Sequence, residues 1–262
     1  MESKFSFIPA GRQKKILEYV EEHGSVQVKE LSEYLGVSEA TVRRDLDELD
    51  STELLQRTHG GAIQNTNKTS TFEMQYSERI ELMQDEKKRI AKKAASFIRE
   101  GDTILLDTGT TCYYLSNELS EIPNLTIITY DLFIANNMVL HPTSTMIVTG
   151  GIRRQGFSNV LLGDMVEDCI RKMHVDKVFL GADAIDLDFG VSNTNILEAS
   201  VKRLLLKAGK KVILIADHTK LNDVALVKVC DLTDIDELIM DNSVSEKEIN
   251  YIKEKIQHIH LA

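Results

Sequence analysis

Short apolar segments that alternate with helical stretches constrain the fold of residues 103–240 more than any other feature of the sequence. Each segment is rich in Ile, Leu and Val and has the length of a strand buried on both faces. The segments are Thr103–Leu106, Leu125–Thr129, Met146–Val148, Lys177–Leu180, Val212–Ala216 and Glu237–Met240. Helices are predicted at 78–99, before the first strand, then near 111–120, 131–140, 160–173, 195–209 and 245–256. Strands joined by helical crossovers predict a Rossmann-like parallel α/β domain with helices on both faces of its sheet.

The turns that follow these strands are the candidate ligand site, because open parallel sheets bind ligands beyond the carboxyl ends of their strands. After the first strand, Gly109 permits a tight turn, and Thr110 and Thr111 open the next helix at its positive end, which favours an anion. A threonine that only caps its helix is the alternative. Asp131 is suited equally to a ligand hydroxyl and to helix capping. Together the turns predict a small, polyhydroxylated, anionic ligand held by Asp107, Gly109, Thr110, Thr111, Asp131, Gly150, Gly151 and Asp183.

Residues 35–49 predict a tight turn followed by a helix whose outward-facing residues are candidates for recognition of a partner. Gly36 supplies the turn, Ser38 caps the helix, and apolar residues recur at the spacing of one buried stripe. Arg44 points away from that stripe, with Ala40 and Arg43 on the same outward side. Small residues followed by two arginines suit a helix in a DNA major groove. The alternative is a surface helix in which the two arginines form ordinary i,i+4 ion pairs with Asp47 and Glu48.

The segments around this helix decide between the two interpretations. Helices at 12–22 and 29–35, a strand at 26–28 and a strand with a glycine turn at 54–62 describe a winged helix-turn-helix. We therefore assign residues 1–63 to a DNA-binding domain, 64–77 to a polar linker and 78–262 to the α/β domain. The expected DNA contacts are Ser38, Ala40, Thr41, Arg43, Arg44, Arg57 and His59.

Charge and composition narrow the possible partners. The net charge is −10, and residues 1–63 carry eight Lys and Arg against twelve Asp and Glu, so DNA recognition must rest on few local contacts. The chain has no apolar run long enough to span a membrane and no secretory signal at its start. Three widely spaced cysteines favour reduced thiols in the cytoplasm, and one close histidine pair, His258 and His260, does not predict a metal site. We expect no cofactor.

Two motifs resemble known families. Residues 38–46, followed by Arg57-Thr58-His59-Gly60-Gly61-Ala62, resemble the DNA-binding signature of DeoR-type bacterial transcriptional regulators. That family usually has a glycine just before the wing strand, where this chain has Glu53, so the exit from the helix is expected to differ in shape. Gly181-Ala-Asp183-Ala-Ile-Asp186, Lys202 and Ala216-Asp217-His218-Thr219-Lys220 resemble ribose-5-phosphate isomerase. The resemblance implies that Asp183 binds sugar hydroxyls and that Lys202 and Lys220 lie near the anionic end or support the pocket. For Lys202 the alternative is a solvated helix lysine.

The isomerase resemblance does not extend to catalysis. The isomerase has a Lys-Gly-Gly-Gly segment where this chain has residues 190–195, without lysine, and Glu198 lies four residues before Lys202 rather than beside it. We therefore expect no catalytic residues. The predicted function is a sequence-specific transcriptional regulator, a repressor of a carbohydrate operon, controlled by a phosphorylated sugar and acting as a homodimer or larger homo-oligomer. The alternatives are a sugar-phosphate isomerase or deaminase with an added helical domain, and an adaptor whose winged helix binds protein.

Overall fold

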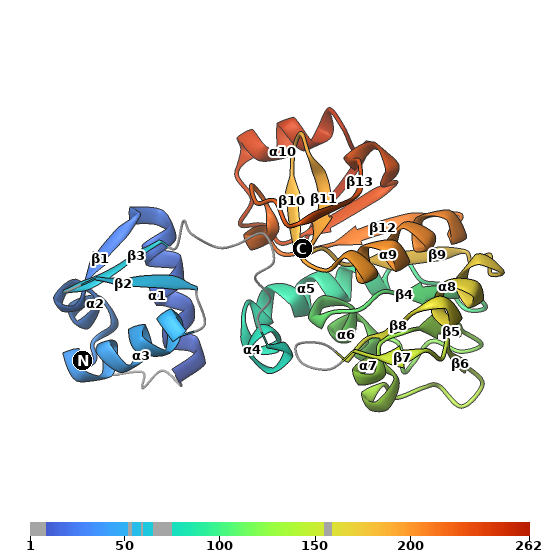
Figure 1. The fold of residues 1–262 in the computed structure, drawn as a ribbon, viewed down its shortest axis with the longest axis horizontal. Coiled ribbons are helices and arrows are strands. Elements are labelled where there is room, and N and C mark those ends of the chain that lie inside the picture. The colour runs from blue at the N-terminus through green and yellow to red at the C-terminus, as the bar shows by residue number, and fades with distance from the viewer. Residues whose placement is uncertain (1–8, 52–53, 59, 65–74, 155–158) are drawn as a thin grey trace. The chain divides into compact units, whose positions relative to one another are not determined.

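The computed structural model describes residues 9–51, 54–58, 60–64, 75–154 and 159–262. The chain forms two compact units, residues 1–69 and residues 70–262 (Figure 1). We call them the winged-helix unit and the sensor unit. Within these described ranges, no helix combines the length and the apolar character needed to cross a membrane.

The winged-helix unit has the predicted architecture. Its elements are α1 (Pro9–His23), β1 (Ser25–Gln27), α2 (Val28–Leu35), α3 (Glu39–Ser51), β2 (Leu55–Thr58) and β3 (Gly61–Gln64), and the strands form an antiparallel sheet in the order β1-β3-β2. The predicted strand at 26–28 is one residue too late, because Val28 already begins α2. Gly36 ends α2 in the left-handed region at φ 66°, which makes the tight turn into α3 possible.

An apolar core and a buried ion pair hold this unit together. The fully buried Ile16, Leu31 and Leu46 bring α1, α2 and α3 into contact. Beside them the Arg12 guanidinium donates to both carboxylate oxygens of Asp45, with Nη2 2.8 Å from Oδ1. Both side chains are almost fully buried, so Arg12 fixes α1 to α3.

The sensor unit is built on a seven-stranded parallel sheet, as the alternation of strands and helices predicts. The strand order is β15-β14-β12-β9-β4-β5-β6. These strands are β4 (Thr103–Leu106), β5 (Thr126–Thr129), β6 (Thr145–Val148), β9 (Lys177–Leu180), β12 (Val212–Ile215), β14 (Glu237–Met240) and β15 (His258–Leu261). Every neighbouring pair is parallel. The last strand, β15, was not predicted.

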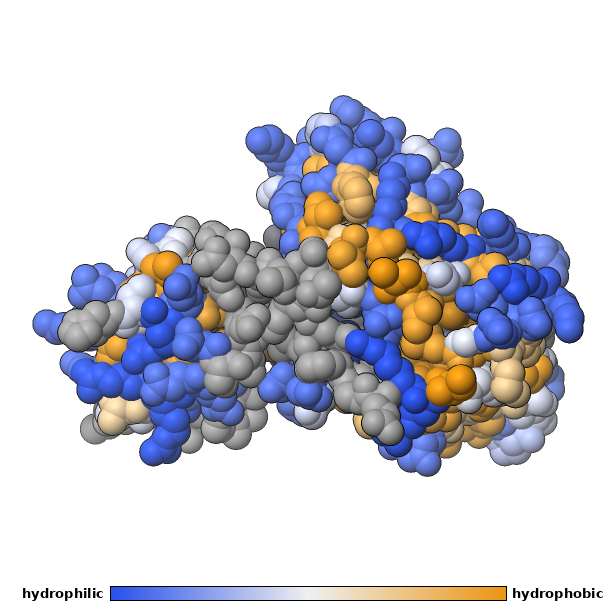
Figure 2. Space-filling view, in the orientation of Figure 1, coloured by the Kyte–Doolittle hydropathy of each residue, from blue (hydrophilic) through white to orange (hydrophobic). Residues whose placement is uncertain are grey.

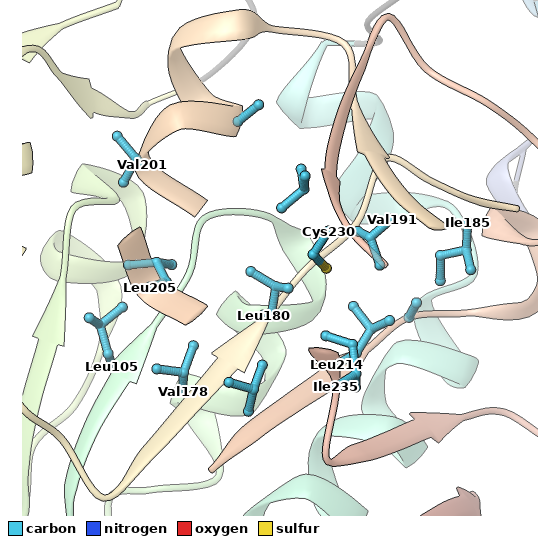
Figure 3. Close-up of a cluster of buried hydrophobic side chains, with 14 of the residues drawn as sticks. Leu105, Val178, Leu180, Ile185, Val191, Val201, Leu205, Leu214, Cys230 and Ile235 are labelled. Atoms are coloured by element: carbon cyan, nitrogen blue, oxygen red, sulfur yellow. The ribbon is translucent and has the colours of Figure 1, made fainter. Parts of the chain in front are cut away.

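Helices cover both faces of this sheet because the strands are apolar on both sides. Leu105, Val178 and Leu214 face a core shared with α8 (Asp164–Arg171), α9 (Ile196–Ala208) and α10 (Glu246–Lys253), part of which is drawn in Figure 3. The alternate residues, such as Ile104 and Phe179, face a second core. That core includes α5 (Gln84–Ala95), α6 (Thr110–Asn117) and α7 (Leu132–Asn137).

Smaller elements surround the carboxyl edge of the sheet. A second sheet, in the order β10-β11-β13, joins β10 (Ala184–Asp186), β11 (Gly190–Asn193) and β13 (Val227–Cys230) in antiparallel pairs. The short hairpin β7 (Ile152–Arg153) and β8 (Leu161–Leu162) replaces the start of the helix predicted at 160–173. Two 3-10 turns complete the unit, η1 (His218–Lys220) and η2 (Leu232–Asp234).

The single helix predicted at 78–99 is wrong. The structure has α4 (Tyr76–Glu81) and then α5, separated at Met83, whose φ is 48°. The α4 helix also begins inside the segment that the sequence assigned to the linker. The buried Lys87 explains the break, because its Nζ donates to the carbonyls of Arg79 and Leu82 at the end of α4. Burial lowers the pKa of Lys87 to about 8.

Candidate nucleic-acid interface and effector site

The outer face of α3 is the candidate nucleic-acid interface. Ser38 caps this helix, with its hydroxyl 3.2 Å from the Thr41 amide and 2.9 Å from the Thr41 hydroxyl. Ala40, Arg43 and Arg44 are exposed. Arg43 pairs with Glu39 at 2.6 Å instead of with Asp47. Both members of the Arg43–Glu39 pair are about half exposed, so the pair adds little stability and leaves Arg43 able to exchange it for a nucleic-acid contact.

Arg57 connects the wing to α3. Its Nε donates to Asp47 at 2.9 Å and its Nη1 donates to the Gly61 carbonyl at 3.0 Å. The side chain is one quarter exposed. Arg57 therefore holds β2 and the start of β3 against α3. His59, the other predicted wing residue, lies outside the described residues.

Asp107 and Lys202 form a buried ion pair at the carboxyl edge of the parallel sheet. Lys202 Nζ donates to Asp107 Oδ2 and, at 3.0 Å, to the Gly181 carbonyl. Asp107 also accepts from the Tyr130 hydroxyl and from the Gly181 amide, the latter at 2.8 Å. Burial opposes the charge on Lys202, but the carboxylates of Asp107 and Asp183 raise its pKa above the usual value. The interpretation of Lys202 as a solvated helix lysine is therefore wrong.

Asp131 is buried and fully engaged by its neighbours. Its Oδ1 accepts from the amides of Phe133 and Ile134 and so caps α7, while its Oδ2 accepts from the Thr108 hydroxyl at 2.8 Å and the Gly109 amide at 3.2 Å. Burial raises the pKa of Asp131, although these four donors oppose the shift. Of the two roles open to Asp131, the structure shows helix capping, and it also shows that Asp131 fixes the 107–111 turn.

The first turn of α6 is the candidate anion site. Its N-cap is Gly109, at φ 112°, which has no side chain to cover the backbone amides that follow. In α7 and α9, by contrast, Asp131 and Asn195 accept from those amides. A Cβ built on Gly109 would meet nothing within 4 Å, so there is space beside the turn. Thr110 is buried and Thr111 is half-buried.

Of the two glycines after β6, Gly151 has a packing role. Gly150 and Gly151 have φ values of 75° and 126°. A Cβ on Gly151 would lie 2.6 Å from Val166 Cγ2 of α8 and 3.0 Å from the Leu162 carbonyl oxygen. Gly151 thus allows the close approach of β8 and α8.

Asp183 lies among cationic groups. Its Oδ2 accepts from the amide and the hydroxyl of Thr194, at 3.0 and 2.9 Å, while Arg79 Nη1 is 3.7 Å from its Oδ1. Burial alone would raise the pKa of Asp183, but Arg79, Lys202, the Thr194 amide and Lys220 lower it. Lys220, at the end of η1, is half-buried. Sequence reasoning missed Arg79, because the segment read as one long charged helix with only its apolar side assigned.

The groups that an isomerase would need are occupied here. Glu198 accepts from Arg154 Nη1 at 2.8 Å, and Lys202 is held by Asp107. In the described part of the chain, no cluster of three or more His, Cys, Asp or Glu side chains could hold a metal ion.

Comparisons with known proteins match both units to domains of the same family. The model of the DeoR-like helix-turn-helix domain matches residues 12–68, and that of the DeoR C-terminal sensor domain matches residues 82–242. The HTH-type transcriptional regulator GolR of Listeria innocua is 33% identical over 91% of this chain and 92% of that protein. The glycerol-3-phosphate regulon repressor of Escherichia coli K12 is 32% identical over 88% of this chain and 90% of that protein. The structure of ribose 5-phosphate isomerase A from Methanocaldococcus jannaschii matches 53% of this chain and 54% of that chain, with 17% identity and a TM-score of 0.38.

Proposed function

Because the chain belongs to the DeoR family of DNA-binding transcriptional regulators, we propose that it represses a carbohydrate operon and that a phosphorylated sugar controls it. The observation that carries the effector assignment is the first turn of α6, where backbone amides without a side-chain cap open at the carboxyl edge of the sheet. The relative from Escherichia coli is named for the regulon of a phosphorylated polyol, which agrees with such a ligand.

We assign two kinds of role to the residues of this site. The amides and hydroxyls of Thr110 and Thr111 bind the phosphate, with Gly109 providing the space. Asp183 Oδ1 accepts from a sugar hydroxyl, since Oδ2 already accepts twice from Thr194, and the half-buried Lys220 adds positive charge at the edge. The buried residues Asp107, Asp131 and Lys202, and the half-buried Gly150 and Gly151, hold the turns in place.

The chain is a regulator and not an enzyme. Its matched relatives are named as transcriptional regulators, and the winged-helix unit has the fold that the DNA-binding signature predicts. Residues 190–195 contain no lysine, and the carboxylate of Glu198 is paired with Arg154. The carboxylate that lies nearest to Lys202 in the sequence is therefore already paired, which fits binding without catalysis.

We expect calorimetry with a panel of sugars to show binding of one phosphorylated form and much weaker binding of its unphosphorylated counterpart. Thr110→Val keeps the size of the side chain but removes a donor, so it should weaken the phosphorylated ligand about tenfold or more. The same substitution at the exposed Thr145 should have no effect. Equal affinity for both forms of the sugar, or formation of a product in a parallel assay, would contradict the assignment.

We expect Arg44→Ala to lower affinity for an operator, selected by the wild-type protein from random DNA, by about 1–3 kcal/mol and to relax its sequence preference. Arg171→Ala is the control, because Arg171 is, like Arg44, an exposed arginine on a helix but belongs to α8 of the sensor unit. Competition titrations with random DNA measure both quantities. A loss equal on operator and random DNA would show that Arg44 contacts only phosphate.

We further propose that the protein acts in the cytoplasm as a homodimer on a repeated or palindromic site, since one winged helix offers a small interface. Exposed apolar side chains support self-association through the sensor unit, whose surface shows grouped hydrophobic residues (Figure 2). The edge strand β6 and the adjoining β7 and α8 carry four exposed apolar side chains, those of Ile147, Val148, Ile152 and Met165.

A further inference from the structure

We propose that Tyr76 and Arg79 of α4 bind the anionic group of the effector together with the first turn of α6. The inference rests on the proposed function and extends it to residues that neither the motifs nor the family match assigns. It also makes α4, the helix that follows the segment connecting the two units, a direct part of the ligand site.

Two buried donors on α4 have no acceptor among the residues that the structure describes. They are the Tyr76 hydroxyl and the Arg79 Nε. Tyr76 is only 7% exposed, and burial raises the pKa of its phenol, so the hydroxyl keeps its proton. A buried donor without an acceptor costs free energy, and such groups are rare in folded proteins. Tyr76 and Arg79 are three residues apart on a helix and therefore share one face.

On the Arg79 guanidinium, Nε is the donor for which the described residues provide no acceptor. Nη1 faces Asp183 Oδ1 across 3.7 Å, which is too long for a hydrogen bond. The edge formed by Nε and Nη2 presents two parallel donors, which is the arrangement that binds phosphate oxygens in pairs. The guanidinium carbon lies 5.7 Å from the centre of the Tyr76 ring, and that ring packs on Phe133 at 4.7 Å, so both side chains are held in place.

This face of α4 adjoins the α6 turn. The Tyr114 hydroxyl of α6 donates to the Ile80 carbonyl at 3.0 Å. The charge of Asp131, which binds the Gly109 amide, acts on the Tyr76 phenol. Helix amides, a guanidinium and a phenol therefore converge on one region, and together they supply the donors that a phosphate needs.

Binding at this region would add contacts to α4, which is a helix of six residues. Lys87 donates to the carbonyls of Arg79 and Leu82 at the end of α4. The face of α4 that carries Tyr76 and Arg79 has the two donors without an acceptor among the described residues. An anion that joins α4 to α6 stabilises α4 in its present position. The α4 helix follows residues 65–74 in the sequence. An effector that binds α4 therefore contacts the first helix after the segment that connects the two units.

Titration with inorganic phosphate tests the inference on the full chain, by calorimetry in a buffer free of other multivalent anions. Wild type should bind phosphate in the millimolar range or tighter. Arg79→Met should lower this affinity about 10- to 100-fold, Tyr76→Phe about fivefold, and Arg79→Lys should restore part of the loss. The control is Arg89→Met, the same change of charge at an exposed position of α5. Hydrogen exchange of residues 76–81 should slow with phosphate in wild type and not in Arg79→Met.

Stability separates this role from a structural one. Without phosphate, Tyr76→Phe should leave the melting temperature unchanged or raise it, because it removes a hydroxyl that lacks an acceptor. The inference is overturned if wild type binds no phosphate at tens of millimolar, if Tyr76→Phe destabilises the protein without weakening phosphate, or if Arg79→Met binds as well as Arg89→Met. Sugar-phosphate binding that persists in Arg79→Met would overturn this inference and leave the proposed function standing.

Discussion

Lys202→Met is expected to destabilise the sensor unit by about 3–5 kcal/mol, the usual consequence of removing one partner of a buried ion pair. Asp107 would keep its hydrogen bonds from the Tyr130 hydroxyl and the Gly181 amide. It would lose the Lys202 ammonium, which is the only cation in contact with it among the described residues. Both side chains of the pair are at most 3% exposed, so water cannot replace the ammonium group. Urea unfolding followed by circular dichroism measures the loss.

Two controls make this result specific. Lys210→Met breaks an exposed ion pair with Asp176 and should cost less than about 1 kcal/mol. Adding Asp107→Asn to Lys202→Met should recover part of the stability, because the uncompensated carboxylate is gone. A loss as small as that of Lys210→Met would show that the pair is not buried in solution.

Gly61→Ala is expected to destabilise the winged-helix unit by about 3 kcal/mol or more and to abolish operator binding. A Cβ at this position would lie 1.8 Å from the Val26 carbonyl oxygen and 2.9 Å from the Gln27 Cα, both backbone atoms that cannot move aside without separating β1 from β3. The displaced β3 would also take the Gly61 carbonyl away from Arg57. Thermal unfolding and operator titration measure the two effects.

The adjacent glycine provides the control. A Cβ on Gly60 would meet nothing within 4 Å, so Gly60→Ala should leave both stability and DNA affinity close to wild type. Ligand binding by the sensor unit should be unchanged in both variants. Equal behaviour of the two variants would show that the wing does not pack as the structure describes.

The regular part of the fold could be predicted from sequence because its signals are local. Apolar runs such as Val212–Ile215 mark strands buried on both faces, and the Gly36 turn with the Ser38 cap marks the helix-turn-helix. The break at Met83 could not be predicted, because Lys87 stabilises it through tertiary contacts that helical periodicity does not reveal. The small sheet β10-β11-β13 was missed because polar and glycine residues interrupt its strands.

The candidate site shows the same division. Asp107, Asp131 and Asp183 were identified because each follows a predicted strand, and the structure places each of them after a strand of the parallel sheet. The direction in which each carboxylate points depends on partners far away in the sequence, such as Lys202 for Asp107 and Thr194 for Asp183. Arg79 and Tyr76 precede the first strand, and nothing in their local pattern relates them to the strand ends.

The order of the strands has a consequence for how the protein folds as it is synthesised. In the winged-helix unit the pairing partners are near in sequence, with Ser25 opposite Ile63, whereas the central strand β4 pairs with β9 through Ile104 and Lys177. Non-local pairing slows folding, and N-terminal units fold first on the ribosome. The winged-helix unit can therefore fold on the nascent chain before β9 and β12 of the sensor unit have been synthesised. During that interval the nascent protein presents its DNA-binding surface before it is able to respond to an effector.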